Sequence, residues 1–487
     1  MDAAELARIA ALEMQTHGLQ PAFGPDVLQE VQASADRLAA QGLERGADIR
    51  DERRRPWFSI DNDDTRDLDQ LSWAEPLPEG RCRLVVAVAD VDTLVPQAGA
   101  VDTHAAANTT SVYTAAGVFP MLPTRLSNDL TSLHEGEERL AMVVDMTIDA
   151  EGSVAAAQLY RAVVHNHAKL TYDGVSAWLD GQADAPRPVR ASAALESQLR
   201  LHDQVAGSLR HFRYRRGALN VMTAQARPVF DNGELVDLRA DRKNRAKDLI
   251  ADLMIAANGA TARFLAEHGQ PSLRRGLQEP RRWDRLVQLA AAHGFTLPQG
   301  PDALALDQFL TARRQAAPAQ FEELSLAVVK LLGSGAYAAA PAGAPKGHHF
   351  GLAVNDYAHS TAPNRRFADL VTQRLLKAAL SQREAPYSYE QLQAIAQHCT
   401  EQEDQASTVE RRVLKAAAAF LLHDRIGERF DAIVTGVATK GTFVRIVSPL
   451  VEGRVVRGFE GLDVGDPVQV RLVGVDLEQR FIDFERA

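Results

Sequence analysis

The chain has 487 residues, 46% of them hydrophobic and 24% charged, which is the composition of a soluble globular protein with more than one domain. Its two cysteines, Cys82 and Cys399, exclude a disulfide framework and a Cys-rich zinc module, and they fit a reducing compartment. A formal net charge of −10 argues against unspecific wrapping of nucleic acid over the whole surface, but it is compatible with a local basic channel.

The first fifty residues have the pattern of short helices. Leu6, Ile9 and Leu12 follow one another at helical spacing, and a second periodic segment begins after Pro25. We predict a small helical domain over residues 1–52 and interpret it as resembling a helix-turn-helix nucleic-acid-binding domain. The N-terminus has no basic segment followed by an apolar core, and the apolar runs are too short or too interrupted to span a bilayer, so we expect a cytoplasmic protein without a membrane segment.

The middle of the chain predicts an α/β domain over residues 53–427. Residues 57–165 have a strand pattern, and the segments after them are helical. The expected helices cover residues 172–179, 192–212, 245–268, 281–293, 304–314, 321–332, 364–380 and 389–426.

The last sixty residues change character. Short alternating segments separated by glycine turns predict a five-stranded OB barrel over residues 428–487. Phe443 lies in one of these segments, where such barrels stack bases; packing of the barrel's own interior is the alternative. The expected fold class is therefore an α+β multidomain protein with helical, mixed α/β and barrel parts.

One acidic stretch follows the linker. Five aspartates fall within residues 61–69, and an apolar strand follows them at residues 83–90 after a Pro/Gly turn. If the stretch is extended, Asp67 and Asp69 share one face, Leu68 points into the core, and Asp61 closes the site from across the loop. Crowded carboxylates require a compensating cation, and hard oxygen ligands favour Mg²⁺ or Mn²⁺.

The acidic stretch has two other interpretations. A solvated acidic loop is the first, and Asp63 and Asp64 are expected to be solvated in either case. A calcium loop is the second, and it fails because Arg66 stands where a glycine is needed and Ser72 where a bidentate glutamate is needed.

Two basic stretches complete the pattern. Residues 210–216 interleave arginines with aromatic side chains, and residues 239–247 carry five basic side chains. Each alone fits a solvated helix face. Together with an acidic metal centre they indicate a phosphodiester substrate.

Several ordered blocks resemble the RNase II/RNase R family of exoribonucleases, whose catalytic domain is called RNB. The acidic stretch looks like the family's signature, and the C-terminal barrel looks like its S1 RNA-binding domain. The acidic end of the chain, without a basic tail, favours an RNase II-like member. The further matching blocks are residues 113–133, 168–173, 254–258, 349–357 and 361–369.

The resemblance implies a site. Asp61, Asp67, Asp69 and Gln70 would hold Mg²⁺, with Mn²⁺ as a substitute, and Asp69 would be essential. Arg365 would be the catalytic arginine that meets the charge on the phosphoryl oxygens. The implied RNA-binding residues are Tyr113, Asp252, Arg366, Glu410 and Phe443.

Each of these RNA contacts has a plain alternative. Tyr113 is either a stacking platform or a half-buried core tyrosine, and Arg366 is either a phosphate contact or an ordinary ion pair. Glu410 lies on a predicted helix, where surface charge is the simpler interpretation. Asp252 is a polar side chain that would read the 2′ hydroxyl.

The chain departs from the family pattern at several positions. Gln70 stands where a fourth carboxylate is usual, and it offers a carbonyl oxygen without the charge. Asn364 precedes the arginine in the block 362–365, which loses its hydroxyl, and the paired acids before residue 254 become Ala251 and Asp252. Val221 aligns with a stacking phenylalanine of some relatives. The first fifty residues are too short for the two cold-shock barrels that usually precede the catalytic domain.

Three hypotheses follow. The leading one is a monomeric, Mg²⁺-dependent, hydrolytic 3′-to-5′ exoribonuclease that degrades single-stranded RNA to nucleoside 5′-monophosphates. The second is an RNA-binding protein with a centre impaired by Gln70. The third is a DNA nuclease recruited by the N-terminal helices.

Overall fold

A six-stranded sheet forms the centre of the computed structural model, which describes all residues except 1, 45, 278–279, 281, 345–346 and 439–440. Its strand order is β1-β8-β2-β3-β4-β7, and a further pairing of β8 with β7 closes five of these strands into a ring. Strands β4 and β7 are rich in β-branched residues and buried along most of their length, so their sequences are apolar runs rather than alternating patterns. The strands are β1 (Ile49–Asp51), β2 (Trp57–Asp61), β3 (Gln70–Pro76), β4 (Cys82–Ala89), β7 (Glu138–Ile148) and β8 (Val154–Thr171).

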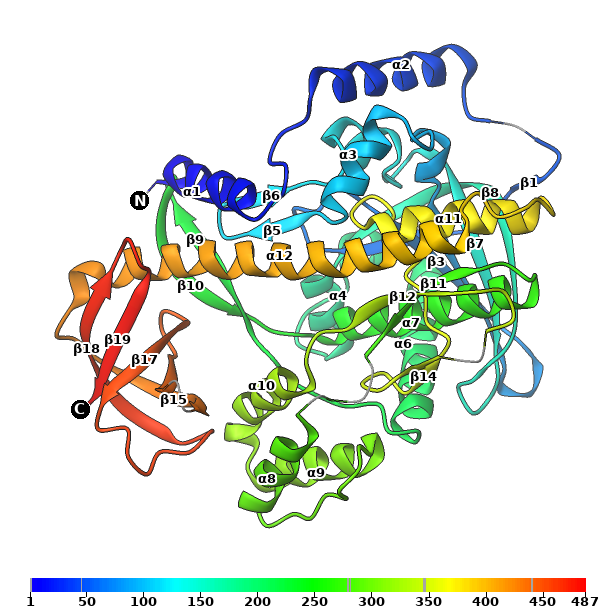
Figure 1. The fold of residues 1–487 in the computed structure, drawn as a ribbon. Helices are drawn as coiled ribbons and strands as arrows, with labels where there is room; N and C mark the ends of the chain where they lie inside the picture. The colour runs from blue at the N-terminus through cyan, green and yellow to red at the C-terminus, as the bar shows by residue number, and fades with distance from the viewer. Residues whose placement is uncertain (1, 45, 278–279, 281, 345–346, 439–440) are drawn as a thin grey trace.

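Helices cover this sheet and share its hydrophobic core (Figure 1). One of them, α7, is long and apolar enough to cross a membrane, but its apolar stretch is mostly enclosed by the protein. We therefore describe α7 as a core helix. The helices are α3 (Ala100–Asn108), α4 (Tyr172–Leu179), α5 (Arg187–Arg190), α6 (Ala193–Tyr214), α7 (Arg245–Glu267) and α11 (Phe367–Leu380).

The longest helix, α12 (Tyr389–Leu422), connects the α/β sheet core, the N-terminal helix α1 and the C-terminal barrel. It has 34 residues, which corresponds to about 50 Å, and it begins with a capping box of Ser388 and Gln391. Its first turns join the core of the sheet, its middle packs against α1, and its last turns pack against the C-terminal barrel. Figure 1 shows it crossing the molecule from the α/β domain to the barrel.

The C-terminal strands form a closed barrel in the order β15-β16-β17-β19-β18, which confirms the predicted five-stranded barrel. Gly453 is required where β17 meets Phe484, because a Cβ at that position would lie within 3 Å of the phenylalanine ring. The strands are β15 (Arg429–Ala438), β16 (Gly441–Ile446), β17 (Val451–Arg457), β18 (Pro467–Asp476) and β19 (Phe481–Arg486).

The N-terminal segment is helical, as predicted, with helices α1 (Ala3–Thr16) and α2 (Pro25–Gln41). The two helices belong to different hydrophobic clusters. Leu6 and Met14 of α1 pack with Val409 of α12, whereas Val27 and Val31 of α2 join the core of the α/β domain. Both helices are thus docked on the rest of the chain, and a helix-turn-helix role in binding nucleic acid stays a prediction.

Smaller elements complete the α/β domain. Three helices form a hydrophobic cluster of their own: α8 (Trp283–Ala292), α9 (Ala303–Ala316) and α10 (Phe321–Leu332). The hairpin of β9 (Gln225–Asp231) and β10 (Glu234–Asp241) was not among the predicted elements. The remaining strands are β5 (Val112–Thr114), β6 (Gly117–Phe119), β11 (Ser272–Gly276), β12 (Ala336–Ala340), β13 (His348–His349) and β14 (Val354–Asn355).

The sheet core gives a first testable prediction. Leu84 of β4 is fully buried, so Leu84→Ala is expected to lower the free energy of unfolding by about 2 to 5 kcal/mol. Leu28 of α2 is 53% exposed, and Leu28→Ala is the matched control, with an expected change below about 0.5 kcal/mol. Urea unfolding followed by tryptophan fluorescence measures both, and equal effects of the two variants would contradict this description of the core.

Candidate active site

The acidic stretch forms the loop between β2 and β3. Asp61 ends β2, where it pairs with Thr171 of β8, and the chain re-enters the sheet at the start of β3. Leu68 is buried in the hydrophobic core, as the alternation predicted. Asp69 is only 3% exposed, so the loop carries a carboxylate into the interior.

Neighbouring segments hold this loop in place. The Ser132 hydroxyl donates to the Arg66 carbonyl at 2.6 Å and accepts from the Leu68 amide at 3.0 Å. On the other side, the Lys169 ammonium donates to the carbonyls of Asp63 and Thr65 at 2.9 and 2.7 Å. The path of the loop is therefore set by the rest of the domain rather than by its own sequence.

Asp69 meets the segment that carries Arg365. Its Oδ1 accepts from the Asn364 amide at 3.3 Å, and its Oδ2 accepts from Arg365 Nε at 3.3 Å. The Arg365 side chain is 44% exposed, so its guanidinium combines an anchor on Asp69 with access to solvent. The structure thus brings together the two residues predicted to be catalytic, which are 296 positions apart in sequence.

Burial raises the pKa of all three candidate ligands. It raises the pKa of Asp69 to about 7, against the opposing effect of Arg365. It also raises the pKa of Asp61, although hydrogen bonds from the Asn62 amide and the Thr65 hydroxyl favour the charged form. Burial raises the pKa of Asp67, and the charge of Asp61 adds to that effect. For these three carboxylates, the nearby cations and hydrogen-bond donors therefore do not fully offset the cost of burying a negative charge.

The structure does not hold a ready-made metal cage. Among the described residues, no three His, Cys, Asp or Glu side chains are grouped closely enough to bind an ion by themselves. Mg²⁺ keeps several waters and is commonly bound through one or two carboxylates together with substrate phosphates. The uncompensated carboxylates of Asp61, Asp67 and Asp69 fit such a site.

Gln70 follows this cluster in sequence at the first position of β3. It pairs with Val88, and its half-buried side chain forms no hydrogen bond within the described part of the chain. A role for Gln70 as a metal ligand stays a prediction.

Tyr113 and Glu410 lie next to the cluster. Tyr113 is in β5, 45% exposed, and its backbone amide donates to Glu410 Oε1 of α12 at 3.0 Å. Just before β5, the Ser111 amide donates to the Arg365 carbonyl at 3.0 Å. This hydrogen bond attaches the β5–β6 hairpin to the segment that carries Arg365. Burial raises the pKa of the Tyr113 hydroxyl to about 12, so it stays protonated.

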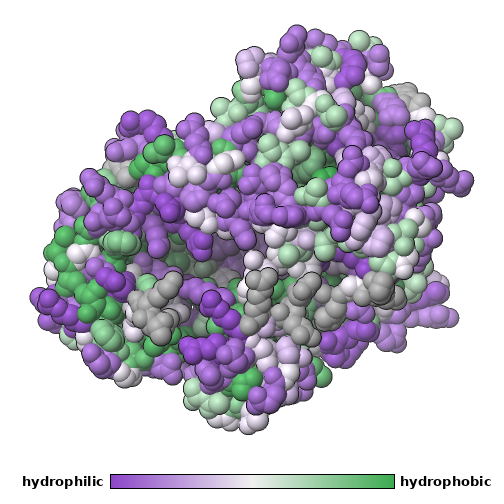
Figure 2. Space-filling model, in the orientation of Figure 1, coloured by the Kyte–Doolittle hydropathy of each residue, from purple (hydrophilic) through white to green (hydrophobic). Residues whose placement is uncertain are grey.

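A large cavity of about 940 Å³ connects the cluster to the barrel. Asp67, Tyr113 and Glu410 line one part of it, and Arg445 and Glu452 of the barrel line another. Figure 2 shows the surface hollowed between α12, the barrel and the helices α8–α10, on a largely hydrophilic face. The cavity therefore extends from the barrel to Asp67, at the edge of the acidic cluster.

Two of the predicted RNA contacts are paired with other residues of the protein, and a third faces outward from the barrel. Arg366 donates two hydrogen bonds of 2.8 Å to Asp369, which matches the ion-pair interpretation. Asp252 is buried and paired with Arg210 and Arg213 in a different cavity, so the structure does not bring it to the acidic cluster. Phe443 is half-buried between the buried residues Thr442 and Val444, so it faces away from the barrel interior.

The sequence alone does not identify the residues that position the site. Ser132 and Lys169 lie inside blocks that resemble the family, but their contacts with the loop depend on tertiary structure. Asn364 is 1% exposed, and its side-chain oxygen accepts from Thr131 at 2.6 Å. No local sequence pattern predicts these hydrogen bonds.

Comparison with protein families gives two matches. Residues 48–382 match the RNB domain, and residues 428–487 match the C-terminal S1 domain of RNase II-type exonucleases. Ribonuclease R of Escherichia coli is 28% identical over 510 aligned positions, which cover 97% of this chain and 61% of that protein. The chain spans between 55% and 61% of the length of the first curated relatives that it matches.

The fold is that of solved structures with the same architecture. The structure of Mycoplasma genitalium RNase R in complex with ribose-methylated single-stranded RNA has a TM-score of 0.85, with 20% identity, 98% of this chain covered and 77% of that chain. Yeast Ssd1, described as a pseudonuclease, has a TM-score of 0.67 with 17% identity, covering 85% of this chain and 51% of that chain. The fold is thus shared with a protein named RNase R and with one described as a pseudonuclease. Since the RNB match alone covers more than half of the residues, this chain belongs to the RNB family and carries an RNase II-type S1 domain at its C-terminal end.

Proposed function

We propose that this chain is a divalent-metal-dependent, hydrolytic 3′-to-5′ exoribonuclease that degrades single-stranded RNA to nucleoside 5′-monophosphates. The observation that carries the proposal is the single cavity that joins the S1 barrel to Asp67 and Tyr113 beside Asp69 and Arg365. Family membership and the activity named for its relatives support the same reaction.

Asp61, Asp67 and Asp69 would hold the metal, and Mg²⁺ suits their hard oxygen donors, with Mn²⁺ as a substitute. A bound divalent ion supplies a water of lowered pKa and neutralises charge on the phosphate. The carboxylates fit this group because burial leaves their own charge uncompensated.

Arg365 contributes the second part of the chemistry. Its Nε donates to Asp69, so the guanidinium is anchored at one edge and would present its terminal nitrogens, beside the Tyr113 hydroxyl, to a phosphoryl group. A planar guanidinium fixed in this way is positioned for the charge that develops as the bond to the 3′ oxygen breaks. Asp69 therefore has two roles, as a metal ligand and as the anchor of Arg365.

Tyr113 and the barrel guide the polymer. The exposed part of the Tyr113 ring lines the cavity next to Asp67, where it offers a stacking surface for the last base. Base stacking on an aromatic side chain contributes about 1 to 3 kcal/mol without sequence preference. In the proposed reaction, a single strand that enters past the barrel would present its 3′ end to the carboxylates and lose one nucleotide at a time.

We further propose a monomeric, cytoplasmic enzyme without a membrane segment. Cys82 and Cys399 are free and buried, which suits a reducing compartment.

A second candidate function is RNA binding without hydrolysis. The uncharged Gln70 favours it, because the cluster then has one carboxylate fewer than the family pattern. The likeness of the fold to that of a protein described as a pseudonuclease is compatible with this second function.

Hydrolysis of end-labelled RNA separates the two functions. We expect the wild-type chain to release nucleoside 5′-monophosphates from the 3′ end in Mg²⁺ and to lose this activity in EDTA. Asp69→Asn is expected to lower kcat at least about a hundredfold, because it removes both a metal ligand and the charge that anchors Arg365. Binding of RNA without any product, by the wild-type chain in Mg²⁺, would instead support the second function.

The matched control is Asp63→Asn, in the same loop. Asp63 is exposed, and its backbone carbonyl rather than its side chain meets Lys169. The control is expected to degrade RNA at the wild-type rate. A matched DNA strand, offered in parallel, tests whether the substrate is RNA.

The raised pKa of Asp69 predicts how stability depends on pH in the absence of metal. With a pKa of about 7 in the folded state and about 3.9 when unfolded, Asp69 holds its proton more tightly in the folded chain, so its ionisation lowers stability as pH rises from 4 to 7. Asp69→Asn is therefore expected to raise the free energy of unfolding by about 2 to 4 kcal/mol at pH 8 and to have little effect at pH 4. Urea unfolding in EDTA measures this difference, and an equal effect at both pH values would refute the electrostatic explanation.

A further inference from the structure

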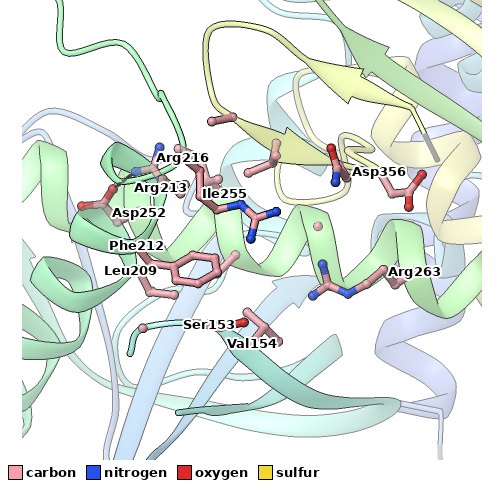
Figure 3. Close-up of a pocket in the computed structure, with 16 residues that line it drawn as sticks. Ser153, Val154, Leu209, Phe212, Arg213, Arg216, Asp252, Ile255, Arg263 and Asp356 are labelled. Carbon is pink, nitrogen blue, oxygen red and sulfur yellow. Dashed lines mark hydrogen bonds and ion pairs between the residues drawn. The ribbon is translucent and has the colours of Figure 1, made fainter. Parts of the chain in front are cut away.

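A second cavity of about 300 Å³ lies beside α7 (Figure 3). Its walls come from the β7–β8 turn, the end of α6, one face of α7 and residues 353–356. Neither the three carboxylates of the acidic cluster nor Arg365 line it. Val154, in its wall, begins β8, whereas Thr171, the partner of Asp61, ends that strand, so the cavity and the acidic cluster lie at opposite ends of an 18-residue strand.

Positive charge dominates this cavity. Arg213, Arg216 and Arg263 line it, together with two aspartates. Both aspartates are already paired with arginines. Asp252 accepts from Arg210 at 2.8 Å and also from Arg213, and Asp356 lies 3.3 Å from Arg274.

Arg263 has no ion-pair partner among the described residues. Its Nη2 is buried without a hydrogen bond, and so is Nε of Arg213. Burial lowers the pKa of Arg263, and the more distant charges of Glu267 and Asp356 only partly offset it. A buried guanidinium without an acceptor is unfavourable, so an anion placed against it would be bound strongly.

The opposite part of the cavity is apolar. Leu209 and Phe212 of α6 and Ile255 of α7 form this wall, and Figure 3 shows the Phe212 ring facing the cavity. Arg216 lies at its edge, with its guanidinium carbon 5.3 Å from the centre of the Phe212 ring. Arg263 reaches back towards Gly259, where a Cβ would lie 3.4 Å from its Nη1, about two helical turns from Asp252. The cavity thus combines an aromatic and aliphatic wall with separate cationic groups.

We propose that this cavity binds a nucleoside monophosphate, with the phosphate at Arg263 and Arg216 and the base against Phe212. The geometry alone points to an organic anion with a flat apolar part. The choice of a nucleoside 5′-monophosphate rests on the proposed function, because that reaction releases this compound. The site would then sense the product outside the acidic centre.

Calorimetric titration of the Asp69→Asn protein with AMP in EDTA tests the proposal. We expect one AMP per chain, bound without metal. Adding Arg263→Gln or Arg216→Gln is expected to weaken AMP binding at least about tenfold, since each removes a charge-assisted hydrogen bond. Arg216 is exposed, so Arg216→Gln keeps the test valid should Arg263→Gln unfold the chain.

Arg200→Gln is the matched control. Arg200 is an exposed arginine of the same helix, α6, paired with Glu196 and outside the cavity, so AMP binding should be unchanged. Inorganic phosphate and adenosine are expected to bind at least tenfold more weakly than AMP. Equal affinity for phosphate and AMP would overturn the nucleotide assignment. An AMP affinity that neither Arg216→Gln nor Arg263→Gln lowers would overturn the location of the site.

The last measurement is competition between AMP and a single-stranded oligoribonucleotide without terminal phosphates. Displacement of AMP by this RNA would assign the cavity to the polymer and overturn the proposal. Because hydrolysis is disabled in this experiment, its result is independent of the proposed function. A wild-type chain that degrades no RNA but whose Asp69→Asn variant binds AMP refutes the enzyme and leaves this site standing.

Discussion

The structure depends on the burial of Asp69 against a single cation. A carboxylate that is almost fully enclosed, with two more carboxylates nearby, is opposed mainly by Arg365. Burying an ion is costly unless charge and hydrogen bonds compensate for it, and here the compensation is incomplete. The fold therefore buries negative charge at a cost in free energy that a bound divalent cation would reduce. The hydrogen bonds from Ser132 and Lys169 hold the acidic loop in this buried position.

The long helix α12 links the segments around this carboxylate to the C-terminal barrel. Along its length it contacts the sheet core, helix α1 and the barrel, so the distance between the barrel and the carboxylates is set by one rigid element. Glu410 lies on this helix and fixes the Tyr113 hairpin, which in turn is docked on the Arg365 segment. The cavity that connects them is therefore preformed, and a bound strand would not have to organise it.

Much of the fold was predictable because its signals are local. The alternation in the last sixty residues, the apolar run of β4 and the periodicity of α12 each specify an element without reference to the rest of the chain. The β9–β10 hairpin was missed although Asn232 and Gly233, both with positive φ, form the Asn-Gly turn typical of hairpins. The docking of α1 and α2 on separate partners could not be read from their periodicity, which says only that each has an apolar face.

The site was predictable in its chemistry but not in its surroundings. The sequence indicated Asp69 and Arg365, and the structure joins them, whereas Asp252 is paired with Arg210 and Arg213 about forty positions upstream.

The proposed chemistry requires that a divalent ion binds at the buried carboxylates. An anomalous difference map from a crystal soaked in Mn²⁺ tests this claim most directly. We predict a peak within coordination distance of Asp67 and Asp69, and a map with no peak at these carboxylates, at a Mn²⁺ concentration that supports RNA hydrolysis, would contradict it.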